Sequence, residues 1–191
     1  MHIGLFFGSF NPIHIGHMAL ANYMASFTDL EQIWFVVSPH NPLKEKASLL
    51  DQNQRLHLVN LAIGDNGNMK SSNIEFSLPQ PSYTVNTLAH LTEKYPKHTF
   101  SLIIGEDNLV SFTKWKNYEH ILAHHKLYVY PRPGCQKTEL YEHPNIIMTE
   151  APLMDISSTF IRNALKLHKD VSFFVPFKVW EYIDEMSFYR K

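Results

Sequence analysis

The chain has 191 residues, of which 45% are hydrophobic and 13% aromatic, which is enough to build one buried core. We therefore expect a single domain over residues 1–191. The 17 Lys and Arg residues nearly balance the 18 Asp and Glu residues, giving a formal net charge of −1. This balance leaves no broad basic surface, so nucleic acid is disfavoured as a partner and any phosphate must be bound locally.

A single cysteine, Cys135, excludes an intramolecular disulfide and a zinc site built from several cysteines. The N-terminus enters an apolar run at 3–7 without the pattern of a signal peptide. No apolar run approaches the roughly 20 residues that a membrane-spanning helix needs. We therefore expect a cytoplasmic protein without a membrane partner.

Short apolar runs typical of buried strands alternate with helical patterns along the chain. Strands are predicted at 3–7, 33–38, 73–77, 100–104, 126–130 and 145–148, and helices at 16–27, 51–63, 84–95, 118–125, 157–167 and 176–186. This alternation predicts an α/β fold, Rossmann-like and doubly wound, whose mostly parallel sheet is covered by helices on both faces. Ligands bind such sheets at the carboxyl ends of the strands.

The turn after the first predicted strand reads Gly-Ser-Phe-Asn-Pro-Ile-His-Ile-Gly-His over residues 8–17. A strand, a short turn and a helix start expose backbone N–H groups that favour an anion. His14 and His17 are three residues apart, so both rings lie on one side of the first helical turn, where they can hold one phosphate. By spacing alone, a metal-binding pair or a packing role is an equally good interpretation.

A second segment, Met-Asp-Ile-Ser-Ser-Thr-Phe-Ile-Arg over residues 154–162, opens a helix near the C-terminus. Helix capping alone would explain Ser157 and Ser158. Arg162 lies four residues after Ser158 and three after Thr159, so hydroxyls, helix N–H groups and a guanidinium can converge on a polyphosphate.

Together these two segments resemble the signatures of the HxGH nucleotidylyltransferases. The resemblance implies that His14, His17 and Arg162 are catalytic, and that ATP is bound by the residues of both segments, namely Gly8, Ser9, Phe10, Ser157, Ser158 and Thr159. Two positions depart from the family pattern, because Phe7 stands where many relatives have a second Gly and Asn11 where many have Asp.

Two further segments, Pro-Ser-Tyr-Thr-Val-Asn-Thr-Leu at 81–88 and the stretch from Gly105 to Lys116, predict by themselves only a capped helix and a loop with an aromatic residue. Both resemble the bacterial nicotinate mononucleotide adenylyltransferases within this superfamily, and the likeness extends from residue 3 to 182. It implies that Thr84, Trp115 and the Lys116 amide bind the nicotinate acceptor. It also implies that Gly105 and Asp107 lie near the adenosine.

A loop with two lysines follows the second predicted strand, and relatives have a Pro-rich His/Lys loop there. A solvated charged loop and a contact with substrate phosphate are equally good interpretations, and we assign Lys44 to the acceptor site on the second of them.

The resemblance implies transfer of the adenylyl group of ATP to nicotinate mononucleotide, with Mg²⁺ arriving on ATP and no dedicated metal site. Two alternatives stay open at this point. One is a phosphopantetheine adenylyltransferase, which shares the two phosphate segments. The other is a nucleotide-binding sensor without turnover, since a fold alone never settles function. The sequence also leaves a homo-oligomer open.

Overall fold

The computed structural model describes residues 1–39 and 49–190. Its strands form one parallel sheet in the order β3-β2-β1-β4-β5-β6. The strand bounds are His2–Gly8 for β1, Gln32–Val37 for β2, Met69–Ser72 for β3, Thr99–Gly105 for β4, Leu127–Tyr130 for β5 and Ile146–Met148 for β6. The predicted Rossmann-like, doubly wound sheet is thereby confirmed, and every described pairing is parallel.

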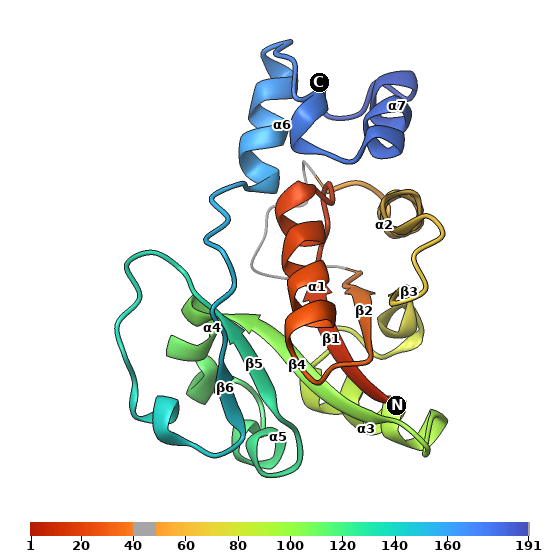
Figure 1. The fold of residues 1–191 in the computed structure, drawn as a ribbon. Coiled ribbons are helices and arrows are strands. Elements are labelled where there is room, and N and C mark those ends of the chain that lie inside the picture. The colour runs from red at the N-terminus through yellow and green to blue at the C-terminus, as the bar shows by residue number, and fades with distance from the viewer. Residues whose placement is uncertain (40–48, 191) are drawn as a thin grey trace.

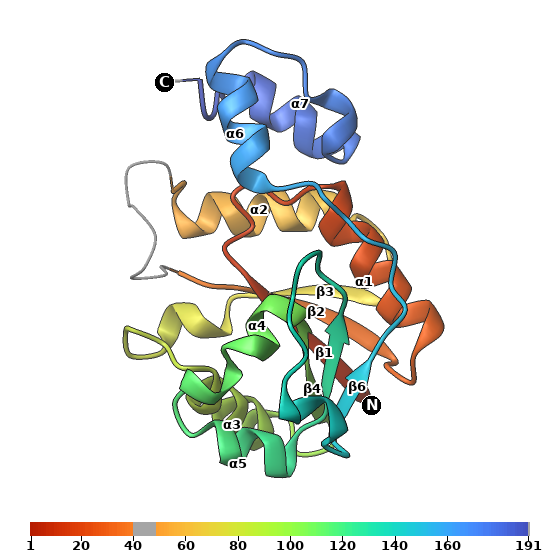
Figure 2. The ribbon, with the colours of Figure 1, turned by 90° about the vertical axis from the view of Figure 1, so that its left-hand side faces the viewer.

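Helices cover both faces of this sheet (Figures 1 and 2). One side carries α1 (Ile15–Phe27), α2 (Gln52–Ile63), α6 (Ser158–Lys166) and α7 (Phe177–Glu185), and the other carries α3 (Thr84–Lys94), α4 (Glu106–Val110) and α5 (Tyr118–His124). The helices predicted from periodicity are all present, and none of their ends differs from the prediction by more than one residue. No described helix is long and apolar enough to cross a membrane.

Alternation along the strands divides the core into two clusters. In β1, Ile3 and Leu5 pack under α3 and α5, whereas Phe6 packs under α1 and α2. In β2, Phe35 and Trp34 are divided between the two clusters in the same way. Because side chains of a strand point alternately to opposite faces, one apolar run supplies both cores.

The third strand differs from the prediction. It lies at Met69–Ser72, whereas residues Ile74–Ser77, within the stretch predicted as a strand, form a 3₁₀ helix. The β-branched and aromatic side chains of Ile74 and Phe76 favoured a strand there. The true strand is short and mostly polar because it lies at the edge of the sheet, where little apolar surface is buried.

The order of the strands reverses at β1, which pairs with β2 on one side and β4 on the other. Ligands bind doubly wound sheets at this point, beyond the carboxyl ends of the strands. Figures 1 and 2 show α6 and α7 beside the start of α1 at this end of the sheet. The C-terminal helices are therefore placed to complete a site that begins at residue 8.

Candidate active site

The turn after β1 is tight, and Phe10 adopts the left-handed conformation with φ of 45°. Its ring is buried, and it folds back over Gly8, where an added Cβ would lie 2.8 Å from the ring. Glycine is therefore required at position 8, because any side chain would displace Phe10. Phe10 thus anchors the turn through its ring and lines the cavity described below.

His14 and His17 meet at the start of α1, as predicted. Their rings stack with centroids 3.7 Å apart and planes 28° from parallel. The backbone N–H of His14, the N-cap residue, donates to Nδ1 of His17 over 3.2 Å. Gly16 makes room for this pair, since a Cβ there would lie 3.1 Å from Nδ1 of His14. The rings are consequently held in place before any ligand binds.

Burial and the positive charge of Arg132 lower the pKa of His14 from 6.5 to about 4. His14 is only 5% exposed, so its desolvation is the larger of the two causes. The imidazole is therefore neutral at pH 7, and it can donate a hydrogen bond to a phosphate oxygen without carrying a charge of its own.

The second predicted segment reaches the first directly. The Ser158 hydroxyl donates to the carbonyl of Pro12 over 2.8 Å, and Arg162 donates to the carbonyl of Asn11 over 2.8 Å. Arg162 also donates to Oγ1 of Thr159 over 3.2 Å. Ser157 has the capping role that was the alternative interpretation, because its Oγ accepts from the N–H of Phe160 over 3.1 Å.

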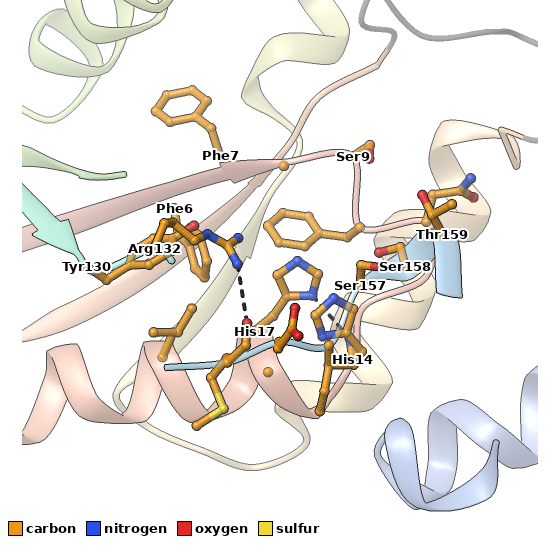
Figure 3. A pocket seen from close by; sticks show the side chains of 18 of the residues that line it. Phe6, Phe7, Ser9, His14, His17, Tyr130, Arg132, Ser157, Ser158 and Thr159 are labelled. Atoms are coloured by element: carbon orange, nitrogen blue, oxygen red, sulfur yellow. Dashed lines mark hydrogen bonds between the residues drawn. The ribbon is translucent and has the colours of Figure 1, made fainter. Parts of the chain in front are cut away.

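A cavity of about 600 Å³ lies between these segments, which is a usual size for a ligand site. Figure 3 shows the two histidines and Ser157–Thr159 around it, with Arg132 and Tyr130 on another wall. The predicted residues that line the cavity are Gly8, Ser9, Phe10, His14, His17, Ser157, Ser158, Thr159 and Arg162. The structure therefore brings together all nine predicted phosphate-binding and catalytic residues of the two segments.

Arg132 is a cavity residue that the sequence analysis missed. Its Nη1 donates to the carbonyl of Met154 over 3.3 Å, and its guanidinium lies 5.2 Å from the centroid of the Tyr130 ring. A signal was available, because Arg132 stands just after the strand predicted at 126–130, at the edge where ligands bind. It gives the cavity a second guanidinium in addition to that of Arg162.

Gly105 and Asp107, which were expected near adenosine, lie at the end of β4 and the start of α4. They are beside the cavity and not among its lining residues, whereas Asn108 of the same helix does line it. The Asp107 carboxylate pairs with Nε of Arg132 over 3.7 Å. A Cβ at Gly105 would collide with the Asp107 carboxylate and would lie in tight contact, 3.1 Å, with the Tyr130 ring.

The two segments predicted to bind the acceptor meet on the other face of the sheet. Thr84 is the first residue of α3. The ammonium of Lys116 lies 4.4 Å from the ring centroid of Tyr83, the residue that precedes Thr84. Trp115, half-buried, packs against Phe112 with ring centroids 5.2 Å apart. None of Thr84, Trp115 and Lys116 lines the 600 Å³ cavity. Lys44 lies outside the described residues.

The two departures from the family pattern have structural explanations. The Phe7 side chain points away from that of Phe6 and packs against the core cluster under α3 and α5 (Figure 3). The side-chain amide oxygen of Asn11, Oδ1, accepts from the N–H of Leu50 over 3.2 Å and from the hydroxyl of Tyr189 over 2.7 Å. Asn11 therefore joins the turn to the C-terminal segment.

Comparison with known proteins agrees with this geometry. The Cytidylyltransferase-like family model matches residues 5–164. Proteins named probable nicotinate-nucleotide adenylyltransferase are 58% identical in Flavobacterium johnsoniae, over 100% of both chains, and 47% identical in Bacteroides fragilis, over 96% of this chain and 92% of the relative. The chain belongs to the nicotinate-nucleotide adenylyltransferase family.

Members of this superfamily with solved structures share the fold. A Plasmodium falciparum nicotinic acid mononucleotide adenylyltransferase complexed with NaAD superposes with a TM-score of 0.83, at 20% identity over 98% of this chain and 97% of the other. The same enzyme complexed with APC gives a TM-score of 0.81 at 20% identity, over 98% and 96% of the two chains. These structures confirm the predicted fold class, and the relatives and the family model described above confirm the predicted family.

Proposed function

We propose that this chain transfers the adenylyl group of ATP to nicotinate mononucleotide, giving deamido-NAD and pyrophosphate, as a single nucleotidylyltransferase domain over 1–191. The observation that carries the proposal is the direct hydrogen bonding between the two phosphate-binding segments, Ser158 to Pro12 and Arg162 to Asn11, around one cavity. Family membership at 58% identity over the full chain supports the same reaction.

The reaction is a direct in-line attack of the nucleotide phosphate on the α-phosphorus of ATP. The O–P bond to the acceptor forms as the bond to the leaving pyrophosphate breaks, without a covalent enzyme intermediate. A phosphate monoester has a second pKa near 6, so the nucleophile is largely ionised at neutral pH and needs no general base. Catalysis then comes from positioning and from stabilisation of charge.

His14 and His17 serve as the donors at the transferred phosphoryl group. Their rings are stacked and fixed, and His14 is kept neutral, so neither reorganises as charge develops on the phosphate. Arg162, Ser158 and Thr159 hold the leaving pyrophosphate at the N-terminus of α6, where helix N–H groups favour an anion. Two N–H groups of Arg162 are used in the bonds to Asn11 and Thr159, which leaves others for phosphate.

The acceptor is placed against the start of α3. There Thr84 and the Lys116 amide offer neutral donors suited to the nicotinate carboxylate, and Trp115 offers a flat apolar face for the pyridine ring. The contact between Lys116 and Tyr83 supports this assignment because it joins the two acceptor segments. Asp107 accepts hydrogen bonds from the adenosine ribose, next to Gly105.

ATP enters as its Mg²⁺ complex. Among residues 1–39 and 49–190, no group of three or more His, Cys, Asp or Glu side chains is arranged to hold a metal ion. We therefore assign the ion to the phosphates of ATP, since Mg²⁺ at nucleotide sites takes many of its ligands from phosphate and water. We also propose a cytoplasmic location, consistent with the single cysteine.

The deciding experiment measures pyrophosphate release from Mg-ATP with nicotinate mononucleotide, nicotinamide mononucleotide or phosphopantetheine as acceptor. We expect a strong preference for the first. Turnover with phosphopantetheine alone would identify the alternative adenylyltransferase, and ATP binding without any turnover would identify a sensor.

Variants at the acceptor site test the residue assignments within the same assay. Thr84→Val and Trp115→Leu should each raise KM for nicotinate mononucleotide at least 10-fold while KM for ATP changes less than 2-fold. An equal rise in both KM values would contradict the acceptor assignment. Comparing Lys116→Ala with wild type separates the side chain from the backbone amide, and only a small effect is expected.

A further inference from the structure

The most completely buried charged side chain in the described chain belongs to Arg55 of α2, which is 0% exposed. Its guanidinium donates to four backbone carbonyls. Nη1 reaches Ser9 and Ser38 over 2.7 Å each, Nη2 reaches Pro39 over 2.6 Å, and Nε reaches Leu50 over 2.9 Å. One side chain thus ties together the turn after β1, the end of β2 and the approach to α2.

Buried arginines are normally paired with a carboxylate, because an uncompensated charge in the interior is costly. No carboxylate of the described residues lies within ion-pair distance of Arg55. The carbonyl dipoles accept from four of its five N–H groups, and among residues 1–39 and 49–190 the charge is offset only at longer range, chiefly by Tyr189 and Asp51. That charge lies immediately behind the turn that lines the phosphate cavity.

The bond to Ser9 fixes the orientation of one particular peptide. In a planar trans peptide the C=O and the following N–H point in opposite directions. The Ser9 carbonyl is directed at Arg55 behind the turn, so the N–H of Phe10 is directed away from Arg55. No described residue accepts a hydrogen bond from this N–H, and Phe10 lines the cavity.

The conformation of the Phe10 backbone depends on contacts with surrounding residues. Phe10 has φ of 45°, a conformation that residues with a Cβ adopt only when surrounding contacts impose it. Burial of the Phe10 ring fixes the side chain, and the Arg55 bond to Ser9 fixes the peptide that precedes it. The two contacts together determine where the Phe10 N–H points.

We propose that Arg55 is a positioning residue of the active site, which orients the Ser9–Phe10 peptide so that the Phe10 N–H donates to the phosphates of ATP. Arg55 itself touches no substrate and acts through the backbone of the turn. The same guanidinium holds the turn at a constant position relative to β2 through Ser38 and Pro39. This role rests on the proposed function for its kinetic consequence, but the geometry of the peptide can be tested without turnover.

The experiment compares wild type with Arg55→Lys and Arg55→Met. Lysine keeps the charge and loses the fork that reaches four carbonyls, so Arg55→Lys separates geometry from electrostatics. Leu58→Ala is the matched control, because Leu58 is also fully buried in α2 and makes none of these bonds. Circular dichroism and thermal unfolding establish which variants are folded.

The structural readout is the backbone amide signal of Phe10 in protein labelled with ¹⁵N-phenylalanine, titrated with inorganic pyrophosphate and Mg²⁺. The Phe160 amide, near Ser158 and Thr159 at the start of α6, is an internal reference in the same spectrum. In wild type both amides should shift. In folded Arg55→Lys, the Phe160 amide should still shift and the response of Phe10 should be lost or reduced several-fold.

Kinetically, Arg55→Lys should lower kcat/KM for ATP at least 10-fold while KM for nicotinate mononucleotide changes less than 2-fold. Leu58→Ala should lose thermal stability and keep both KM values. Wild-type kinetics with an unchanged Phe10 response in folded Arg55→Lys would overturn the proposal. If the Phe10 amide signal of the wild type did not shift with pyrophosphate, the proposal would be overturned even if every Arg55 variant failed to fold. Absence of wild-type turnover would contradict the proposed function and leave the amide test valid.

Discussion

The hydroxyl of Ser158 donates a 2.8 Å hydrogen bond to the carbonyl of Pro12, across a separation of 146 residues. This bond joins the first turn of the chain to the N-terminus of α6, and the Arg162 bond to Asn11 reinforces the connection. Each segment alone is an anion site of a common kind, a turn or a helix N-terminus. Joined by these bonds, the two segments line one cavity of about 600 Å³.

Ser158→Ala is expected to lower kcat/KM for ATP roughly 10-fold, because it removes the bond that holds the N-terminus of α6 against the turn and so displaces the pyrophosphate site. The free energy of unfolding should fall by only about 1 kcal/mol, the usual net value of one hydrogen bond. Thr92→Val is the control, since Thr92 donates to a carbonyl in a similar way within α3, remote from the cavity. Equal kinetic losses in the two variants would show that the effect of Ser158 is not local.

His17→Ala should lower kcat by about 10² or more, the scale of removing one donor to the transition state. The ring also accepts the N–H of His14, so a loss of about 1 kcal/mol in stability is expected as well. His17→Asn supplies an acceptor at the same position and should restore most of the stability without restoring kcat. Full turnover of His17→Ala at saturating substrates would contradict the catalytic assignment.

The pH dependence of folding should report the environment of His14. Its pKa is about 4 in the folded chain against 6.5 for an exposed histidine, so between these values the unfolded chain binds more protons. Stability is then fully present above pH 6.5 and is lost as the pH falls toward 4, by at most about 3 kcal/mol at 1.36 kcal/mol per pKa unit. Denaturant unfolding of wild type and His14→Gln from pH 4 to 7.5 measures this, and equal slopes in the two proteins would contradict it.

Much of the site follows from local sequence. The turn at 8–17 and the helix start at 157–162 can be identified from their residue types and spacing. The apolar runs of β1 and β2 predict strands whose side chains are buried alternately on the two faces of the sheet. Arg132 and Arg55 were not identified, because their importance depends on which segments of the chain become neighbours. In the sequence Arg55 is one of several polar residues of a predicted helix, and only the packed fold directs it to the carbonyls of Ser9 and Ser38.

The third strand illustrates the opposite limit. Apolar residues at 74 and 76 favoured a strand, yet an edge position needs little apolar surface, so the polar segment Met69–Ser72 takes it. The 3₁₀ turn that follows buries Glu75, whose carboxylate accepts from the Thr87 hydroxyl over 2.8 Å. Burial raises the pKa of Glu75. Neither the turn nor this contact has a signature in local propensity, because both depend on α3 packing against the turn.

Arg132→Gln tests whether the missed arginine acts on both the substrate and His14. Removing its charge should raise the pKa of His14 toward 6.5, by less than the effect of burial, since burial is the larger cause of the depression. The same variant should raise KM for ATP about 10-fold, because one of the two guanidinium groups that line the cavity is lost.

Proton NMR titration of the His14 ring and steady-state kinetics measure the two effects of Arg132→Gln on one protein. Arg190→Gln is the matched control, since Arg190 pairs with Asp184 and does not line the cavity. A raised KM with an unmoved His14 pKa would assign Arg132 to substrate binding alone, and an unchanged KM would remove it from the site.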